Sequence, residues 1–281
     1  MSFNKVLAIH DLSCHGASSL NVVMPVLYAA GVDLSILPCA LLSTQSDGFG
    51  NLYTHSLEDD CQAILDRWSG YGLFFDGLYS GYLAHEGQLE LVMRARRDFL
   101  TDDALIVTDP VMGDDGVLYQ NLGSGHVDLM KALVPGSAVI TPNATEACLL
   151  LGRSQIDGAV DRHEAEDMAR SLCALGCASA VITSLPLKGE VIANVAWDGK
   201  ECRIFPFERV EASYPGSGDL FASLMVAHLH QNDSFFVSVM KATRFTSHAL
   251  RQSLRSGRER REGVCVHHAI SAMLEEGSWV L

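Results

Sequence analysis

The sequence predicts a three-layer α/β fold, in which a mostly parallel central sheet is covered by helices on both faces. Short β-branched runs alternate with amphipathic stretches along the chain, which is typical of repeated strand–helix–strand units. Of the 281 residues, 48% are hydrophobic and 19% charged, as in a globular protein with a large core. We find no internal repeat, low-complexity tract or long linker, so we expect a single domain over residues 1–281 without a separate lid.

The first half of the chain contains the predicted strands and helices in alternation. Ser19–Ala30 has apolar residues at helical spacing and is followed by Gly31, which is typical of a helix end. Ser56 and Asp59 form a capping pair at the start of the next amphipathic stretch. We therefore expect strands at Val6–Ile9, Asp33–Leu37, Leu73–Phe75 and Leu105–Thr108, and helices at Ser19–Ala30, Ser56–Ser69 and His85–Leu100.

The second half continues this alternation until a hairpin interrupts it. Two strand-like runs, Val191–Trp197 and Cys202–Phe205, flank Asp198-Gly199, which is a strong signal for a tight turn between antiparallel strands. Two or three helices then end the chain. Before the hairpin we expect helices at Gly125–Leu133, Thr145–Leu151 and Glu164–Leu175, and strands at Ala138–Thr141 and Ala180–Thr183.

Charge and hydropathy argue against several classes of protein. The formal net charge of −14 opposes a nucleic-acid-binding face, so any phosphate would be held by backbone amides and a metal. The longest apolar runs, Leu20–Ala30 and Ala222–Leu229, are far shorter than the ~20 residues that cross a bilayer. The start of the chain lacks the apolar core of a signal peptide, and the cysteines have no paired spacing. We expect a cytoplasmic protein with reduced thiols and with neither membrane nor nucleic-acid partners.

Polar residues follow the predicted strands at one edge of the sheet. In open parallel sheets, ligands bind outside the carboxyl ends of the strands. Core packing alone does not explain so many polar groups in these positions, so we expect the functional site there. The residues are Asp11, Ser46, Tyr82, Asp109, Asp114, Thr141, Asn143, Glu146, Thr183 and Ser184.

A glycine-rich turn within residues 215–223 runs directly into an apolar helix. The amides of Gly216, Ser217 and Gly218 can converge there, and with the positive end of the helix dipole they suit the charge of a transferring phosphoryl group. Asp219 is placed to accept a proton from a substrate alcohol. On the local pattern alone, a simple helix-capping role for Ser217 or Asp219 has equal weight.

Two further segments bring carboxylates to the same edge. Asp109 and Asp114 lie on a loop after a buried strand, where hard oxygen ligands can hold Mg²⁺ directly or through water. Glu146 offers another carboxylate in the first turn of a helix. The alternative explanation of Glu146 is a favourable charge near the helix dipole.

Five motifs, taken in order, resemble those of one superfamily. They read SGYL at Ser80–Leu83, DPVMGDDGVLY at Asp109–Tyr119, ITPNATE at Ile140–Glu146, VITS at Val181–Ser184 and GSGD at Gly216–Asp219. Together they resemble the ribokinase-like superfamily and, within it, the pyridoxal (vitamin B6) kinases. The resemblance extends from about Lys5 to Ala272, which is nearly the whole chain.

The resemblance implies an ATP-dependent kinase that phosphorylates the 5′-hydroxymethyl group of pyridoxal, pyridoxine or pyridoxamine in the salvage of pyridoxal 5′-phosphate. Asp219 would be the base, and Gly216, Ser217 and Gly218 would form the anion hole. The nucleotide would contact Asp109, Thr141, Asn143, Glu146, Thr183, Ser184, Arg209 and Val210, and Asp109, Asp114 and Glu146 would organise Mg²⁺. The vitamin ring would lie beside Asp11, Ser46, Tyr82 and Asp219. The family also implies a homodimer and commonly K⁺.

Two positions depart from the family pattern. Many pyridoxal kinases carry Ser where this chain has Asp11, and His-Thr where it has Gln45-Ser46. A carboxylate that faces the pyridine nitrogen favours the protonated form of the ring. We therefore hypothesise that Asp11 tunes ring protonation and the preference among the B6 forms.

Three alternatives stay open at this point. A hydroxymethylpyrimidine kinase of thiamine synthesis is similar in its DPVM stretch and anion hole, but usually has Cys in place of Asp219 and lacks the Gly113-Asp114 pair. A sugar kinase of the same superfamily would need an early strand-rich insertion that forms a lid, and the sequence has none. A non-catalytic binder built on the kinase fold would not need the base, the anion hole and the carboxylates that are all present.

Overall fold

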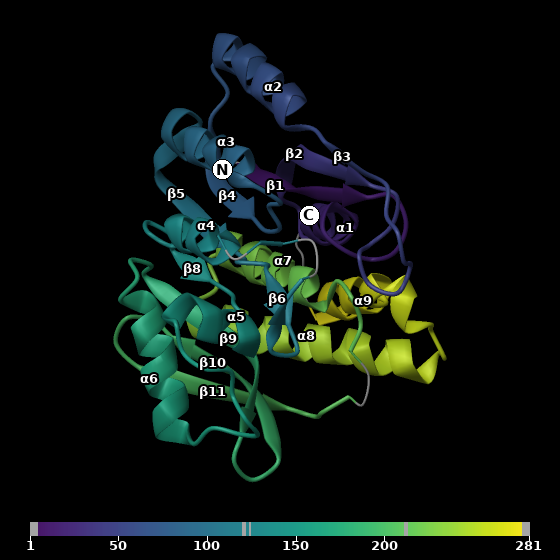
Figure 1. Ribbon diagram of the computed structural model, residues 1–281, viewed down its shortest axis with the longest axis vertical. Coiled ribbons are helices and arrows are strands. Elements are labelled where there is room, and N and C mark those ends of the chain that lie inside the picture. Colours follow the sequence, from purple (N-terminus) through teal and green to yellow (C-terminus); the bar gives the residue numbers. More distant parts are fainter. Residues whose placement is uncertain (1–4, 120–121, 124, 211–212, 277–281) are drawn as a thin grey trace.

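The structure, a computed structural model, has the predicted α/β architecture (Figure 1). It describes residues 5–119, 122–123, 125–210 and 213–276. The strands are β1 Lys5–Ser13, β2 Asp33–Leu42, β3 Thr54–Ser56, β4 Phe75–Ser80, β5 Leu100–Thr108, β6 Gly113–Asp114, β7 Val117–Leu118, β8 Val139–Ile140, β9 Ser179–Leu187, β10 Val191–Trp197 and β11 Cys202–Phe207. The helices are α1 Leu20–Ala29, α2 Glu58–Tyr71, α3 Glu86–Asp98, α4 His126–Leu133, α5 Ala144–Leu151, α6 Arg162–Cys173, α7 Ser217–His230, α8 Phe235–Arg255, the short 3₁₀ helix η1 Arg260–Glu262 and α9 Val266–Glu276.

One nine-stranded sheet runs through the described residues in the order β11-β10-β9-β8-β5-β4-β1-β2-β3. Neighbours from β9 to β2 pair in parallel, whereas β3, β10 and β11 join by antiparallel pairs. β6 and β7 form a separate hairpin in the loop after β5. Because β11 runs in the same direction as β9, the carboxyl ends of β1, β5, β8, β9 and β11 share one edge of the sheet.

Helices cover both faces of this sheet and enclose two hydrophobic cores. One core lies under α2 to α6, and the other lies under α1, α7, α8 and α9. The division is visible within β1, because Leu7 and Ile9 belong to the first core while Val6 and Ala8 belong to the second. Burial on both faces explains why the central strands read as continuous apolar runs rather than as an alternating pattern.

All eight cysteines are free thiols, as their scattered spacing predicted. In the part of the chain that the structure describes, no helix combines the length and the apolar character that crossing a bilayer demands.

The position of β4 differs from the sequence prediction. We expected a strand at Leu73–Phe75, but the strand spans Phe75–Ser80. Phe74 is 55% exposed, so the apolar residues just before Phe75 lie on the surface. The polar Asp76 is tolerated near the start of the strand because it accepts a hydrogen bond from the N–H of Lys5 at 3.2 Å.

Other differences concern boundaries and short strands. Ser56 ends β3, and its hydroxyl accepts the N–H of Glu58 at 3.4 Å, so α2 begins without the predicted capping pair of Ser56 and Asp59. Leu100 begins β5 instead of ending α3. The sequence did not predict β3, β6 or β7, because strands of two or three residues are too short for an alternating pattern to be recognised.

Candidate active site

Side chains from four parts of the chain meet at the carboxyl edge of the sheet. β1 carries Asp11, the loop after β5 carries Asp109, and the segment from β8 to α5 carries Thr141 and Glu146, while the first turn of α7 carries Asp219. Parallel strands place their carboxyl ends on one side, so residues far apart in sequence become neighbours there. The predicted edge is therefore the one where these polar groups lie.

α7 begins at the glycine-rich turn. Its N-cap residue Gly216 has φ +80°, and a β carbon at this position would lie 2.2 Å from the carbonyl oxygen of Ala17. The left-handed backbone and this close approach together require glycine. The N-cap position of α7 is Gly216, which has no side chain, so Ser217 and Asp219 lie inside the first turn rather than at the cap. The first-turn amides have no carbonyl partner within the helix. The N–H of Ser217 donates to the carbonyl of Tyr214 at 3.3 Å, and the amides beside it can donate to an anion.

Asp219 contacts the start of α1 rather than its own helix. Its Oδ2 accepts the N–H of Ser19 at 2.8 Å, and its Oδ1 lies 3.9 Å from Nδ1 of His10. The pKa of Asp219 is raised to about 7. Burial is the main cause, the N–H of Ser19 lowers the pKa in part, and the charge of Asp11 adds a smaller increase. A carboxylate whose pKa lies near neutrality is suited to general-base catalysis.

Asp109 lies beside the glycine-rich turn at the start of α7. It is 4% exposed, and its Oδ1 accepts the hydroxyl of Thr141 at 3.0 Å. A β carbon on Gly218 would lie 4.0 Å from Oδ2 of Asp109, so this oxygen faces the turn. Burial and, to a smaller extent, the charge of Asp219 together raise the pKa of Asp109 to about 8. Two carboxylates that repel each other in this way favour a bound cation.

Glu146 and Asn143 fix the loop after β5 to the start of α5. The Asn143 side chain accepts the N–H of Glu146 and the Glu146 side chain accepts the N–H of Asn143, each at 2.9 Å, as a capping box. Glu146 Oε1 also accepts the N–H of Met112 at 3.0 Å, and Asn143 Nδ2 donates to the carbonyl of Gly113 at 2.8 Å. Burial, followed by the charge of Asp109, raises the pKa of Glu146 well above its usual range. Glu146 thus lies in the first turn of α5, where the helix-dipole explanation places it, and its hydrogen bonds are compatible with a metal role.

His10 lies beside Asp219 and was not among the predicted site residues. It is fully buried, and its ring occupies space that a side chain at residue 81 would need, since a β carbon on Gly81 would lie 1.7 Å from Cε1. The ring is edge-on to Tyr79, with centroids 4.8 Å apart. Burial lowers the pKa of His10 to about 3, so it is a neutral imidazole beside the carboxylate. The glycine in SGYL was visible in the sequence, but the side chain that it accommodates was not.

The residues predicted to contact the vitamin ring differ in exposure. Asp11 is 2% exposed, and its Oδ1 and Oδ2 accept the hydroxyls of Ser19 at 2.5 Å and Ser13 at 3.2 Å. Ser46 is exposed in the loop after β2, and Tyr82 is half-buried after β4. Asp11 is therefore buried, whereas Ser46 and Tyr82 are accessible at the surface.

Four of the residues predicted to contact the nucleotide, Thr183, Ser184, Arg209 and Val210, lie on β9 or follow β11. Thr183 donates its N–H to the carbonyl of Pro142 at 2.8 Å, which joins β9 to the segment before α5. Ser184 is exposed with φ +54°, and its N–H donates to Oδ1 of Asn194 at 3.0 Å. Exposed Arg209 and half-buried Val210 follow β11. The sequence analysis missed Asn194, which holds the backbone of Ser184 in its left-handed conformation.

Comparison with known proteins assigns this arrangement to a family. A family model described as phosphomethylpyrimidine kinase matches residues 76–263. The chain belongs to this family. A pyridoxine/pyridoxal/pyridoxamine kinase of Bordetella avium (strain 197N) is 30% identical over 259 residues, which cover 87% of this chain and 84% of that protein.

Solved structures of the phosphomethylpyrimidine kinase family and of pyridoxal kinases have the same fold. A Bacteroides thetaiotaomicron protein assigned to this family and crystallised with pyridoxal superposes with a TM-score of 0.88 at 32% identity, over 97% of this chain and 96% of that chain. Pyridoxal kinase from Lactobacillus plantarum gives a TM-score of 0.88 at 28% identity, over 98% of both chains. The resemblance to pyridoxal kinases of the ribokinase-like superfamily is thus confirmed, and the protein is an enzyme, a kinase.

Phosphomethylpyrimidine kinase family membership implies Mg²⁺, and the residues present fit a cation that arrives with ATP. In the stretches of chain that the structure describes, there is no group of three or more His, Cys, Asp or Glu side chains that could hold a metal by themselves. Asp109 and Glu146 are nevertheless two buried carboxylates, and the charge of Asp109 raises the pKa of Glu146. A cation would relieve this repulsion, with phosphate oxygens and water as its remaining ligands. Asp114 is exposed on β6.

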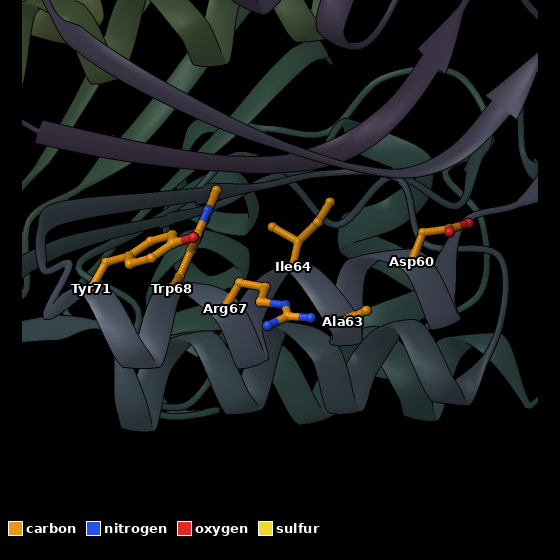
Figure 2. Close-up of a pocket in the computed structure, with 6 residues that line it drawn as sticks. All are labelled: Asp60, Ala63, Ile64, Arg67, Trp68 and Tyr71. Carbon is orange, nitrogen blue, oxygen red and sulfur yellow. The ribbon is translucent and has the colours of Figure 1, made fainter.

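A shallow surface depression lies away from the kinase site. Its lining residues all come from α2, at spacings of three and four that define one helix face (Figure 2). None of them follows a parallel strand, so this depression does not belong to the edge where the family's motifs meet. The lining residues are Asp60, Ala63, Ile64, Arg67, Trp68 and Tyr71.

Proposed function

We propose that this enzyme transfers the γ-phosphoryl group of ATP to the 5′-hydroxymethyl group of pyridoxal, pyridoxine or pyridoxamine, in the salvage of pyridoxal 5′-phosphate. The observation that carries the proposal is the environment of Asp219. Its pKa is near 7, it lies in the first turn of a helix whose N-cap residue has no side chain, and the carboxylate of Asp109 lies close enough to interact with it. The names of the relatives support vitamin B6 as the substrate. The Bordetella avium relative is a kinase of all three vitamers, and the Bacteroides thetaiotaomicron protein was crystallised with pyridoxal.

In the proposed reaction Asp219 accepts the proton of the 5′-hydroxyl group as the hydroxyl oxygen attacks the γ-phosphorus. The bond from the γ-phosphorus to the bridging oxygen breaks, and its electron pair leaves with ADP. The backbone amides from Gly216 to Asp219 donate to the γ-phosphate oxygens, and the helix dipole stabilises the charge in the same place. Because these donors are fixed by the Gly216 turn, little reorganisation is needed during the transfer.

Mg²⁺, when bound with ATP, neutralises phosphate charge and orients the leaving group. In this chain Asp109 and Glu146 would hold its water ligands, and Asp114 would add a carboxylate from the exposed side. Thr141 keeps Asp109 in place through its hydroxyl, and Asn143 keeps Glu146 in place through the capping box. The protein's part is to hold these carboxylates toward the glycine-rich turn.

The substrates would occupy opposite sides of Asp219. The vitamin ring would contact Tyr82 and Ser46, and the nucleotide would extend past Asn143 toward the residues of β9 and those that follow β11, namely Thr183, Ser184, Arg209 and Val210. Each carboxylate oxygen of Asp11 has two lone pairs, and one lone pair on each oxygen accepts a serine hydroxyl. The hypothesis that Asp11 tunes ring protonation requires one of the two remaining lone pairs to face the ring. A K⁺ requirement, a homodimer and a cytoplasmic location stay predictions from the sequence.

Hydroxymethylpyrimidine phosphorylation is the second candidate, because the matching family model describes a phosphomethylpyrimidine kinase. Both reactions transfer a phosphoryl group to a hydroxymethyl substituent of a nitrogen heterocycle, so the same base and anion hole would serve. The presence of Asp219, where hydroxymethylpyrimidine kinases usually have Cys, and of the Gly113-Asp114 pair in β6 favours the vitamin B6 reaction.

The test is turnover of Mg-ATP with pyridoxal, pyridoxine, pyridoxamine and hydroxymethylpyrimidine, measured side by side. We expect phosphorylation of at least one vitamer at a higher kcat/KM than the pyrimidine. Asp219→Asn should lower kcat by a factor of about 10² to 10⁴, as for the loss of a general base. Turnover of the pyrimidine alone would move the protein to thiamine synthesis, and turnover of none would contradict the proposal.

A further inference from the structure

Ser19 binds two carboxylates at once, one with its side chain and one with its backbone. Its hydroxyl donates to Oδ1 of Asp11 at 2.5 Å, and its N–H donates to Oδ2 of Asp219 at 2.8 Å. Asp11 is 2% exposed, and the hydroxyl of Ser13 donates to its other oxygen at 3.2 Å. A continuous chain of hydrogen bonds therefore joins the end of β1 to the residue that we propose as the base.

Ser19 adopts a backbone conformation that its own helix does not require. It is the N-cap residue of α1, with φ +50° and ψ −132°, a region that residues other than glycine rarely occupy. A serine at an N-cap usually turns its hydroxyl to an amide of the first helical turn, but here no such bond is formed and the hydroxyl goes to Asp11. The local sequence alone would favour the ordinary cap, and the contact with Asp11 takes its place.

We propose that Asp11 is a positioning residue, which holds the Ser19 hydroxyl so that the left-handed Ser19 backbone points its N–H at Asp219. This inference rests on the proposed function, because it assigns a role toward the base of that reaction. The bond to Ser19 occupies Oδ2 of Asp219 and leaves Oδ1 for the substrate hydroxyl. His10 lies 3.9 Å from Oδ1 on the buried side, so the carboxylate is confined from two directions.

The kinetic test compares Asp11→Ala, Asp11→Asn and Ser19→Ala at about pH 8, where Asp219 is ionised. Loss of either partner should lower kcat by about tenfold to a hundredfold, because a small displacement of a reacting group has effects of this size. The KM values for ATP and for the vitamer should stay within about twofold of the parent values, because neither Asp11 nor Ser19 needs to touch a substrate in this role.

The conservative variant separates positioning from a general loss of structure. The amide oxygen of Asn can still accept the Ser19 hydroxyl, so Asp11→Asn should lower kcat less than Asp11→Ala does. The double variant Asp11→Ala/Ser19→Ala should be no slower than either single variant, because both changes break the same chain. Ser13→Ala is the matched control. It removes a hydroxyl from the other oxygen of Asp11 and should leave kcat within about twofold.

Amide hydrogen exchange at Ser19, followed by NMR, reports on the hydrogen bond from its N–H to Asp219 and does not require enzyme activity. The Ser19 amide should be protected in the parent protein, and Asp11→Ala should accelerate its exchange at least about tenfold, while Ser13→Ala should not. Unchanged exchange in Asp11→Ala would overturn the inference. If Asp11→Ala fails to fold, unchanged exchange at residue 19 in Ser19→Ala would overturn it.

The outcomes distinguish this inference from the proposed function. If Asp11→Ala raises the KM for the vitamer while Ser19→Ala has no effect, Asp11 is a ring contact and the positioning role is wrong, although the kinase function stands. If the parent protein phosphorylates no vitamer, the proposed function fails, and the exchange measurement still decides whether Asp11 holds Ser19 against Asp219. Variants that all stay within twofold in kcat would also contradict the positioning role.

Discussion

Protonation of a single residue, Asp219, determines the pH dependence that we expect for the reaction. Burial raises its pKa to about 7, and only the ionised form can accept the proton of the substrate hydroxyl. kcat/KM for the vitamer should therefore fall as the pH decreases through about 7 and approach a tenfold loss per pH unit below it. The measurement is kcat/KM from about pH 5.5 to about pH 9 at saturating Mg-ATP.

Asp11→Asn provides the control for this assignment. The charge of Asp11 contributes to the raised pKa of Asp219, so its removal should move the acid limb to lower pH. A profile that stays flat through pH 7, or a limb that moves to higher pH in Asp11→Asn, would show that another group controls the reaction.

At the scale of elements, the start of α7 depends on glycine for two separate reasons. Gly216→Ala would place a β carbon 2.2 Å from the Ala17 carbonyl and would strain a backbone with φ +80°. We expect a loss of at least about a hundredfold in kcat/KM, because the first-turn amides would no longer be oriented toward the phosphate. The comparison variant is Gly31→Ala, where φ is +75° and no atom lies within 4 Å of the added carbon.

The pair of variants separates the clash from the backbone strain. Gly31→Ala should lower stability by about 1 kcal/mol and leave kcat/KM unchanged, since only the unfavourable φ is involved. Equal losses of activity in both variants would mean that the contact between Gly216 and Ala17 does not position the anion hole.

Much of the fold could be predicted at this scale because long elements carry a periodic signal. α6 and β10 lie close to their predicted ranges, and the turn between β10 and β11 was visible in Asp198-Gly199. β4 was misplaced because its sequence contains Asp76 and Gly77, while the apolar Leu73 and Phe74 before it lie on the surface. Pattern reasoning assumes that apolar residues are buried, and this assumption fails when tertiary packing covers a less apolar segment instead.

The site was predictable where its residues form contiguous motifs, and not where the contacts are long-range. Asp109, Glu146 and Asp219 each stand in a recognisable motif. Ser19 was read only as the start of a helix, and its N–H meets a carboxylate 200 positions along the chain. Nothing in the sequence near Ser19 signals that contact, because it depends on how α1 and α7 pack over the same face of the sheet.

At the scale of the whole molecule, the buried carboxylates of the site make the stability of the fold depend on pH. The pKa values of Asp11, Asp219 and Asp109 rise to about 6, about 7 and about 8, all above the value of about 4 expected in the unfolded chain. The folded state therefore binds protons more tightly than the unfolded state. The stability that these groups contribute is fully present below about pH 4 and is lost as the pH rises through the folded values, up to about pH 8.

Asp219→Asn should accordingly be more stable than the parent protein at pH 8, although it is nearly inactive. It removes a buried charge at that pH, and we expect an increase of about 2 to 4 °C in Tm for each kcal/mol gained. At about pH 5 the gain should shrink, because the parent carboxylate is already protonated there. The measurement is thermal unfolding of both proteins at the two pH values, with Asp103→Asn, an exposed substitution, as the control that should show no pH-dependent difference. A gain of the same size at both pH values, or a loss at pH 8, would mean that Asp219 is not held as an unfavourable charge in the folded protein.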